Sequence, residues 1–277
     1  MSFSLAESGK RRRMGRIFKA DGKAVMIAVN HGLGYGPAAG IDDMPRLLVK
    51  IMPQKPDSIT MHQGMVKCFA DDLKRDTALI LKVTNATRYF SPEETTVAPI
   101  ADAVCIGADA IAVGLSLCGP KEADEIVRAG RFVSEADAMG IPVIAHSYPC
   151  GDFLNDTEKF LVKNVAYAVR VAQEIGIDII KTYWTGDQKS FEQIVAIGAP
   201  AKVVISGGPR CETLRECFEM TKAGIDSGAS GITYGRNIWQ HPYPEAVTAG
   251  LMEIVHNGAN VNTAMEAAQS ISGTKLI

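Results

Sequence analysis

The chain has 277 residues, and its 29 Lys and Arg against 31 Asp and Glu give a formal net charge of -2. A hydrophobic content of 47% with 22% charged residues is typical of a globular chain that buries a sizeable core. The composition excludes disordered, fibrous and disulfide-scaffold proteins. The near-neutral charge does not favour nucleic acid or an anionic membrane as a partner, so we expect a small-molecule or protein partner.

The start of the chain favours a cytoplasmic protein. No stretch approaches the roughly 20 uninterrupted apolar residues of a membrane helix. The first residues are polar and basic, with Arg11, Arg12 and Arg13 in a run, rather than an apolar signal core. We interpret this run as part of a solvated N-terminal segment rather than as an interaction tag. The six cysteines show no CxxC spacing and are expected to be free thiols.

Short apolar runs recur along the chain, mostly with room for a helix between them. Their interiors are continuously apolar rather than alternating, as expected of parallel strands covered on both faces. The eight runs are 24–30, 58–62, 78–83, 110–114, 141–147, 177–183, 201–206 and 231–235.

The junctions between these runs support a repeated strand–helix unit. Gly107, Gly176 and Gly228 each precede a strand by two or three residues, where a glycine suits the end of a helix. Residues 158–175 show the apolar spacing of an amphipathic helix. No linker or abrupt composition shift divides the chain. We therefore predict one domain over residues 1–277, a closed (β/α)8 barrel rather than an open sheet.

In such a barrel, chemistry takes place at the carboxyl ends of the strands. We therefore selected the polar residues that end each apolar run. They are Asn30, His31, His62, Lys82, His146, Tyr148, Lys181, Tyr183, Ser206 and Arg236.

Lys181 follows an apolar run, and burial there would lower its pKa and free the neutral amine to attack a carbonyl. The simpler reading of one such lysine is an ion pair with a carboxylate or a contact with a phosphate. Lys82 is a second inward lysine. It either keeps Lys181 neutral by repulsion or carries the imine itself.

Other strand-end residues carry weaker signals. Tyr148 is a candidate proton shuttle beside a lysine, or an aromatic cap on the barrel mouth. His31 and His146 are secondary candidates for acid–base work or substrate binding. Cys150 lacks a clear base partner and is taken as a spectator thiol. The histidine spacing matches no metal motif, so neither a metal nor another cofactor is expected.

Two glycine turns at neighbouring strand ends predict an anion site. Ser206, Gly207 and Gly208 end one run, and Gly235 with Arg236 ends the next. Glycines let backbone N–H groups approach an anion, and the loops after strands seven and eight of these barrels often bind phosphate. Arg236 would clamp it with paired hydrogen bonds. Each turn alone is also explained as a tight strand–helix connection.

Taken together, these residues resemble the archaeal-type, or DhnA-type, class I aldolases of the DeoC/LacD-like group. That group includes fructose-bisphosphate aldolases, aminodideoxyheptulosonate synthases and a thiolase acting on a phosphorylated autoinducer product. The matching segments run in family order over nearly the whole chain. They are NHGLGYGP at 30–37, LILK at 79–82, SYPCG at 147–151, IIKTYWTGD at 179–187, ISGGPR at 205–210 and GRNIWQ at 235–240.

The resemblance implies that Lys181, rather than Lys82, forms the Schiff base and that Tyr148 is the acid–base group. It implies a metal-independent aldolase acting on a phosphorylated ketose, such as fructose 1,6-bisphosphate, and commonly a homo-oligomer. A heptulosonate synthase or acyl-transferring thiolase of the same family is the alternative, and a non-catalytic sugar-phosphate binding protein is a further one. The predicted substrate- and phosphate-binding residues are Ser206, Gly207, Gly208, Gly235, Arg236, His31, Lys82 and His146.

Three positions depart from the family pattern. Asn30 stands where the family usually has Asp. We place it with the catalytic residues, although an amide can neither accept a proton nor balance a cation by charge. Cys150 replaces the usual Arg, which weakens the expectation of a second substrate phosphate. His146 stands where fructose-bisphosphate aldolases often have Trp. These changes indicate a paralogue with another acceptor.

Overall fold

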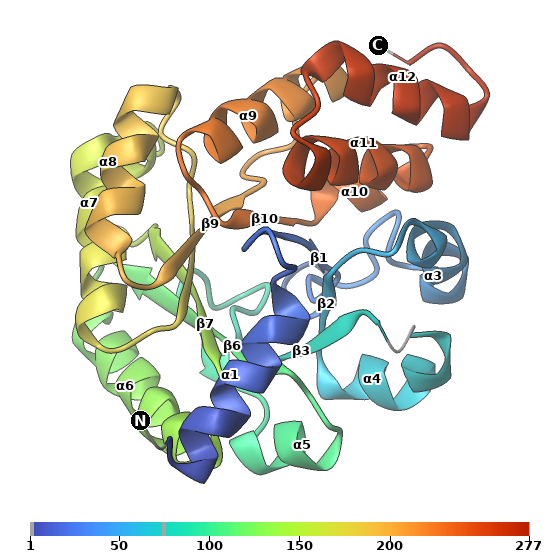
Figure 1. Cartoon of the computed structure of the whole chain (residues 1–277). Coiled ribbons are helices and arrows are strands. Elements are labelled where there is room, and N and C mark those ends of the chain that lie inside the picture. The colour runs from blue at the N-terminus through green and yellow to red at the C-terminus, as the bar shows by residue number, and fades with distance from the viewer. Residues whose placement is uncertain (1–2, 74–75, 277) are drawn as a thin grey trace.

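Eight parallel strands close into a barrel in the computed structural model, which describes residues 3–73 and 76–276 (Figure 1). Each predicted apolar run overlaps one strand, although the strands at 110–117 and 143–149 extend beyond the predicted runs, and the last strand pairs with the first. The (β/α)8 prediction is therefore confirmed. In order around the barrel, the strands are β1 (Ala24–Ala28), β2 (Ser58–Met61), β3 (Ala78–Lys82), β6 (Ala110–Leu117), β7 (Val143–Pro149), β8 (Ile179–Thr182), β9 (Lys202–Ser206) and β10 (Gly231–Tyr234).

Helices connect the strands and surround the barrel (Figure 1). The α-helices are α1 (Leu5–Ile17), α2 (Gly32–Tyr35), α3 (Met44–Ile51), α4 (Gln63–Phe69), α5 (Ile100–Cys105), α6 (Glu122–Met139), α7 (Val162–Glu174), α8 (Gln188–Gly198), α9 (Leu214–Asp226), α10 (Arg236–Trp239), α11 (Pro244–Asn257) and α12 (Val261–Ser272). Three 3-10 turns are η1 (Met52–Gln54), η2 (Ala70–Asp72) and η3 (Glu158–Phe160). A separate two-stranded antiparallel sheet joins β4 (Thr84–Asn85) to β5 (Thr95–Thr96).

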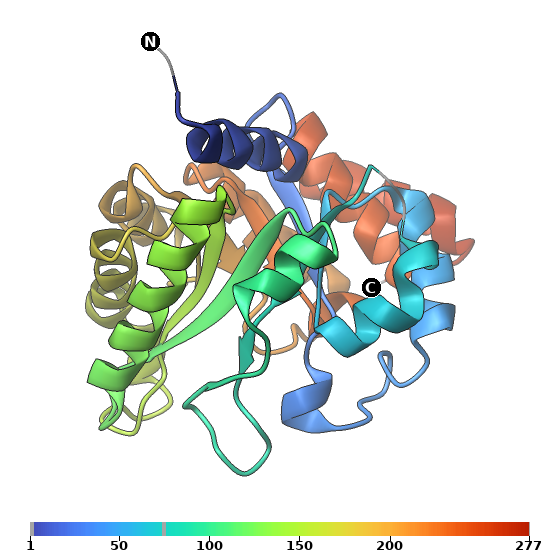
Figure 2. The same cartoon turned by 90° about the horizontal axis from the view of Figure 1, so that it is seen from below.

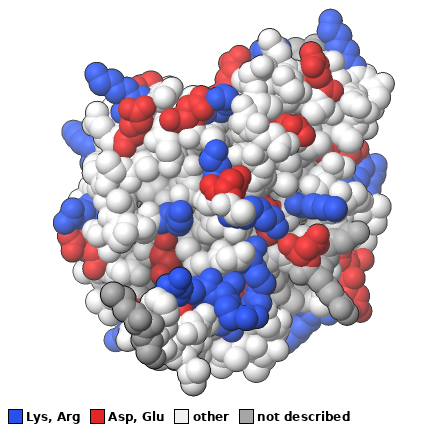
Figure 3. All heavy atoms as spheres, viewed as in Figure 1, with Lys and Arg blue, Asp and Glu red and all other residues white. Residues whose placement is uncertain are grey.

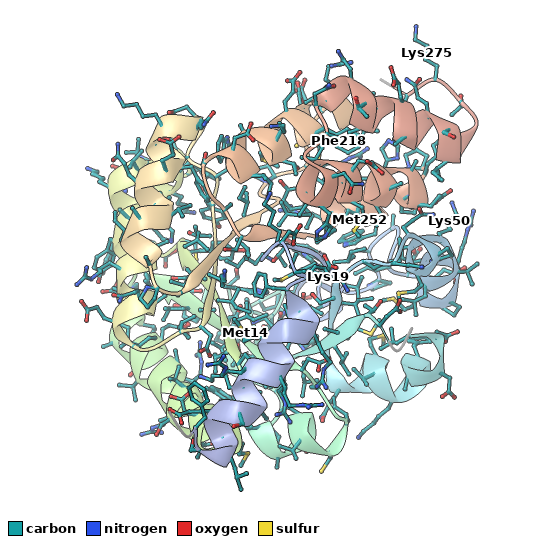
Figure 4. The ribbon with its side chains drawn as sticks, in the orientation of Figure 1. Met14, Lys19, Lys50, Phe218, Met252 and Lys275 are labelled. Carbon is teal, nitrogen blue, oxygen red and sulfur yellow. The ribbon has the colours of Figure 1, made fainter. Side chains whose placement is uncertain are left out.

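The pleat divides each strand between two cores. On β1, Ala24 and Met26 face the barrel interior, whereas Val25 and Ile27 face the surrounding helices. The outer core continues between helices, where Phe218 of α9 lies against α11 (Figure 4). Because both faces of a strand are buried, its sequence is apolar throughout rather than alternating.

The predicted strand–helix junctions are present, with one difference in a helix. Gly107, Gly176 and Gly228 all have positive φ, between 68° and 89°, which an L-residue with a Cβ rarely adopts. The helix expected over 158–175 is instead the turn η3 followed by α7. Leu161 separates the two with extended backbone, so Phe160 does not continue the buried stripe of α7.

Helix α1 lies across the amino-terminal mouth of the barrel (Figure 2). Ile17 and Phe18 are buried against the inward residues of the strands, and Met14 packs on them (Figure 4). The carboxyl ends of the strands and the loops that follow them lie at the opposite mouth. The barrel is thus closed at one end and accessible from the other.

Three ion pairs fasten α1 and the residues after it to the strands. Each uses an aspartate that directly precedes a strand. Asp178 pairs with Lys10, Asp109 with Arg16, and Asp57 with Lys19. Each aspartate also accepts a hydrogen bond from a backbone N–H of the neighbouring strand, at Val143, Leu79 and Val25 respectively. One carboxylate therefore ties two strands and the closing helix together.

The basic run lies on α1, where Lys and Arg side chains gather on the surface (Figure 3). Arg11 and Arg12 are exposed, as expected of a solvated segment, whereas Arg13 is half-buried and donates to the carbonyl of Gly140 at 3.2 Å. Within residues 3–73 and 76–276, every helix is too short or too polar to span a bilayer. All six cysteines are free thiols, as predicted.

Candidate active site

A cavity of about 720 Å³ opens at the carboxyl ends of the strands. Ten of the eleven predicted site residues line it, and Lys82 is the exception. The ten are Asn30, His31, His146, Tyr148, Lys181, Ser206, Gly207, Gly208, Gly235 and Arg236.

The pleat explains why residues so far apart in sequence meet here. Ile144 and Ile179 face the barrel interior, so every second residue after them also points inward. His146 and Tyr148 on β7 and Lys181 on β8 follow this rule, and His146 is the register partner of Lys181. Parallel strands end at the same edge of the sheet, so these side chains form one layer at the open mouth.

Lys181 is a buried lysine whose amine is not held by a carboxylate among the described residues. Its side chain is only 6% exposed and lies on the cavity wall. Burial, and then the positive charge of Lys82, lower the pKa of Lys181 to about 7, and the negative charge of Glu94 opposes this shift. A substantial fraction of the amine is therefore neutral near pH 7 and able to act as a nucleophile.

Lys82 lies behind the cavity rather than on its wall. Its side chain is fully buried, and its Nζ pairs with Oε2 of Glu94 at 2.5 Å and donates to Oγ1 of Thr84 at 3.2 Å. Lys82 was predicted to bind substrate, but it is the one predicted site residue that is not among the described lining residues of the cavity. Its charge still reaches Lys181, as the repulsion hypothesis supposes.

Tyr148 belongs to a stack of aromatic rings on one wall. Its ring lies 4.3 Å from that of Tyr183, which in turn contacts Phe160 at 4.9 Å between ring centroids. Burial, and then Tyr183, raise the pKa of Tyr148 well above its usual value, while a hydrogen bond with Ser206 lowers it. The phenol therefore keeps its proton at neutral pH in the free protein.

The histidines of the site are held neutral. Burial, and then the charge of Lys181, lower the pKa of His31 to about 3 and place that of His146 well below its usual value. His31 stacks on Tyr35 and meets Trp239 edge to face, and its Nδ1 has no partner among the described residues. A neutral imidazole offers substrate a hydrogen bond but no charge.

Asn30 is fixed by its amide nitrogen, which donates to Oδ1 of Asn85 at 3.2 Å. Its own Oδ1 is buried without a partner among the described residues. Because an unpaired buried acceptor is costly, this oxygen is placed to accept a hydrogen bond from a donor that enters the cavity, such as a substrate hydroxyl. The ring nitrogens of His62 lie 2.9 and 3.1 Å from the backbone carbonyl oxygens of Lys82 and Asn30, and the protonated nitrogen donates to its carbonyl, so His62 supports the wall from behind.

The two glycine turns follow β9 and β10, next to the strand that carries Lys181, and line the same cavity. Arg236 donates from Nη2 to the carbonyl of Gly208 at 2.7 Å, and Asn237 donates to the carbonyl of Gly207 at 2.9 Å. A Cβ on Gly235 would lie 2.5 Å from Cε1 of His31, and Gly208 has a φ of +55°. Both turns thus require glycine. They place the guanidinium of Arg236 beside the half-buried backbone of residues 207–208 on the cavity wall, as an anion site needs.

Strand-end reasoning missed the residues that come from loops. Glu94 and Arg88 line the cavity from the segment between β4 and β5, and Asn85, Tyr35 and Phe160 join them. Glu94 is the one carboxylate among the described lining residues. No periodic pattern marks this segment, although its length between two strands was a signal that it forms more than a turn.

Cys150 is not among the described lining residues, and burial raises the pKa of its thiol to about 11, which agrees with a spectator role. Within the described part of the chain, no three His, Cys, Asp or Glu side chains are grouped to hold a metal ion.

The family model of the DeoC/LacD family aldolases matches residues 24–241. The chain belongs to this family. Among its curated relatives, the 2-amino-3,7-dideoxy-D-threo-hept-6-ulosonate synthase 1 of Archaeoglobus fulgidus is 31% identical over 260 residues, covering 93% of this chain and 95% of the relative. The corresponding synthase of Halobacterium salinarum is 28% identical and covers 95% of this chain and 98% of the relative.

Solved structures place this DeoC/LacD family member near aldolases that bind substrate covalently. The structure of a Schiff base forming fructose-1,6-bisphosphate aldolase has a TM-score of 0.81 and 27% sequence identity. The match covers 89% of this chain and all of that one. The resemblance noted from the sequence is thus confirmed at the level of the family.

Proposed function

We propose that this protein is a Schiff-base-forming class I aldolase that makes or breaks a carbon–carbon bond in a phosphorylated ketose. The observation that carries the proposal is the amine of Lys181, with its pKa of about 7, on the wall of a cavity that Arg236 and two glycine turns also line. A nucleophilic amine and an anion site in one cavity suit a substrate with a carbonyl and a phosphate.

The amine of Lys181 adds to the substrate carbonyl carbon. Loss of the carbonyl oxygen as water, with uptake of one proton, leaves an iminium cation. This cation accepts the electron pair of the breaking carbon–carbon bond, so cleavage yields an enamine rather than a free carbanion. Segments 206–208 and 235–236 would hold the phosphate and align the carbonyl with the amine.

Tyr148 is the proposed acid–base group. Its buried phenol is protonated in the free protein, so it is ready to donate to the alkoxide formed in carbon–carbon bond formation. In the cleavage direction Tyr148 first supplies the proton that is taken up when water is lost, and the resulting phenolate then accepts the proton of the substrate hydroxyl. The iminium cation at Lys181 favours that step, because a nearby positive charge stabilises a phenolate.

Borohydride trapping with a panel of phosphorylated ketoses tests the proposal. We expect the mass of a reduced adduct on the peptide that contains Lys181, insensitive to EDTA, and no adduct or turnover with Lys181→Ala. An adduct on Lys82, or none with any ketose phosphate, contradicts the assignment. A binding protein without catalysis would retain ligand and give no adduct.

A transferase of the same imine chemistry is the second candidate. The named heptulosonate synthases at 28% and 31% identity favour it. Such an enzyme holds the enamine until an acceptor carbonyl arrives. Product analysis with and without an acceptor aldehyde separates the two, since a lyase releases product without acceptor. An acyl-transferring thiolase would instead require coenzyme A.

A further inference from the structure

We infer that the Lys82–Glu94 ion pair controls the charge on Lys181. Lys82 holds the carboxylate of Glu94 and so leaves the amine of Lys181 without a counter-ion. The same carboxylate stays on the cavity wall to balance the positive charge when Lys181 becomes a cation. The catalytic part of this inference rests on the proposed function, whereas the effect on the Lys181 amine does not.

The pair is built into the barrel. The carboxylate of Glu94 receives Nζ of Lys82 at 2.5 Å and the hydroxyl of Thr84, also at 2.5 Å. Oγ1 of Thr84 in turn accepts the N–H of Gly114 at 2.7 Å. A Cβ on Gly114 would lie 1.8 Å from the carboxyl carbon of Glu94, so the carboxylate occupies the space that the absent side chain leaves on β6.

The backbone at Glu94 is held from outside the barrel. Arg128 of α6 donates to the carbonyl of Glu94 and pairs with Glu125 at 2.5 Å. Glu125 also accepts the N–H of Glu94 at 3.3 Å. Both the N–H and the carbonyl of Glu94 are therefore hydrogen-bonded, as in a strand, although Glu94 lies outside both β4 and β5.

The charges explain why the pair matters to Lys181. Burial raises the pKa of Glu94, but Lys82, the hydroxyl of Thr84 and the charge of Arg128 together outweigh this effect and lower it, so the carboxylate is ionised. It is the one negative side chain among the described lining residues, in a cavity that also contains Arg88, Arg236 and Lys181. An unpaired carboxylate here would attract the proton of the nearest free amine and raise its pKa.

The ionisable groups that face Lys181 are few. Those that act on it or line its cavity are Lys82 on β3, Arg88 and Glu94 between β4 and β5, His146 and Tyr148 on β7, Tyr183 after β8, His31 and Tyr35 after β1, and Arg236 on α10. His31, His146, Tyr148 and Tyr183 are neutral near pH 7. Only Lys82 and Glu94 therefore form a pair that a single substitution unbalances.

Lys82→Met tests the inference, because it removes the charge and keeps an apolar stem of similar length. We expect the pH at which Lys181 becomes reactive to rise by about one unit or more, since the repulsion by Lys82 is lost and the charge of Glu94 is no longer offset. The rate at which an amine-reactive ester modifies Lys181, followed by peptide mass spectrometry from pH 5.5 to 9.5, measures this directly. The measurement needs no turnover, so it stays informative if the proposed function fails.

Three further variants complete the design. Lys82→Met with Glu94→Gln should return the reactive pH toward that of the wild type, because the carboxylate is gone. Glu94→Gln alone should lower the fraction of Lys181 trapped by borohydride at pH 7 about tenfold, since the iminium loses its counter-charge. Lys222→Met is the matched control. It breaks the 2.6 Å pair with Asp226 on α9, and Lys181 should not change.

If folded Lys82→Met leaves the reactive pH of Lys181 unchanged, the pair is only structural and the inference is wrong. Should Lys82→Met fail to fold, Lys82→Gln removes the same charge while keeping a group that bonds Glu94 and Thr84. A reactive pH that stays raised in the double variant also contradicts a role for Glu94.

Discussion

The lowered pKa of Lys181 comes from its surroundings rather than from a single partner. Burial is the largest influence on its pKa, and neighbouring charges adjust the result to about 7. An ordinary lysine titrates near 10.4 and is almost wholly protonated at pH 7. The difference increases the neutral fraction of this amine by about three orders of magnitude.

The pH dependence of the reaction should therefore report Lys181. Imine formation needs the neutral amine, so kcat/KM should rise as the pH increases through about 7 and level off above it. Initial rates from pH 5.5 to 9 measure this. His31 and His146 are already neutral in this range and should not contribute a second transition. A limb centred near pH 10 would mean that the amine is not perturbed.

Removal of the phenol should separate the two chemical roles. Tyr148→Phe keeps the stacked ring and loses the proton carrier, so kcat should fall by about 10²–10⁴-fold while borohydride still traps the adduct on Lys181. Tyr183→Phe is the control, since it keeps the stack and alters the neighbouring hydroxyl. If the two variants lose the same activity, Tyr148 has no special role in proton transfer.

The contrast between Lys82 and Lys181 shows what the sequence reveals at this scale. Both lysines end apolar runs, and the pleat turns both inward, so the pattern selects them together. What distinguishes them is Glu94, which lies 12 residues from Lys82 in a loop without periodicity. The partner that removes Lys82 from the candidates was therefore not visible in the sequence pattern.

Among the elements, the strands were predictable and the loops were not. The runs at β1 and β9 are apolar on both faces because the barrel and the helices bury them on both sides. Such runs are visible without knowledge of the fold. The small sheet of β4 and β5 has only two residues per strand, and β5 is exposed, so no apolar pattern marks it.

The turns after β9 and β10 form one anion site in the proposed function, and Arg236 is its only cation among the described lining residues of those turns. Arg236→Gln should raise the KM for a ketose phosphate about 10–100-fold, which corresponds to loss of a charge-assisted bond. The effect should be much smaller for a substrate without phosphate. Arg210→Gln is the control, because Arg210 lies in the same loop and lines a different, smaller pocket.

At the scale of the whole molecule, α1 is fastened to the barrel by contacts between distant residues. Lys10 pairs with Asp137 and with Asp178, which lie 127 and 168 residues further along the chain. Sequence pattern identifies the helix and the aspartates separately but not their pairing. The two carboxylates also differ, since Asp178 accepts the backbone N–H of Val143 and Asp137 is largely exposed.

These two aspartates provide a matched test of the closing helix. Asp178→Asn should lower the free energy of unfolding by about 1–3 kcal/mol, because a partly buried charged bond and a strand contact are lost. Asp137→Asn should change it by about 0.5 kcal/mol or less, as expected of an exposed ion pair. Urea titrations of both variants measure the difference. Equal losses would mean that Asp178 does not link the strands to α1.

Because α1 closes one mouth of the barrel, the water of the proposed reaction enters and leaves through the other. Each imine formed at Lys181 expels one water molecule, and each imine hydrolysed consumes one. With α1 across the amino-terminal end, that water must use the same passage as the sugar phosphate. While the first product fills the passage, neither water nor a second carbonyl compound can reach the covalent intermediate. Once that product leaves, the access of water relative to that of the second carbonyl compound would decide between cleavage and transfer.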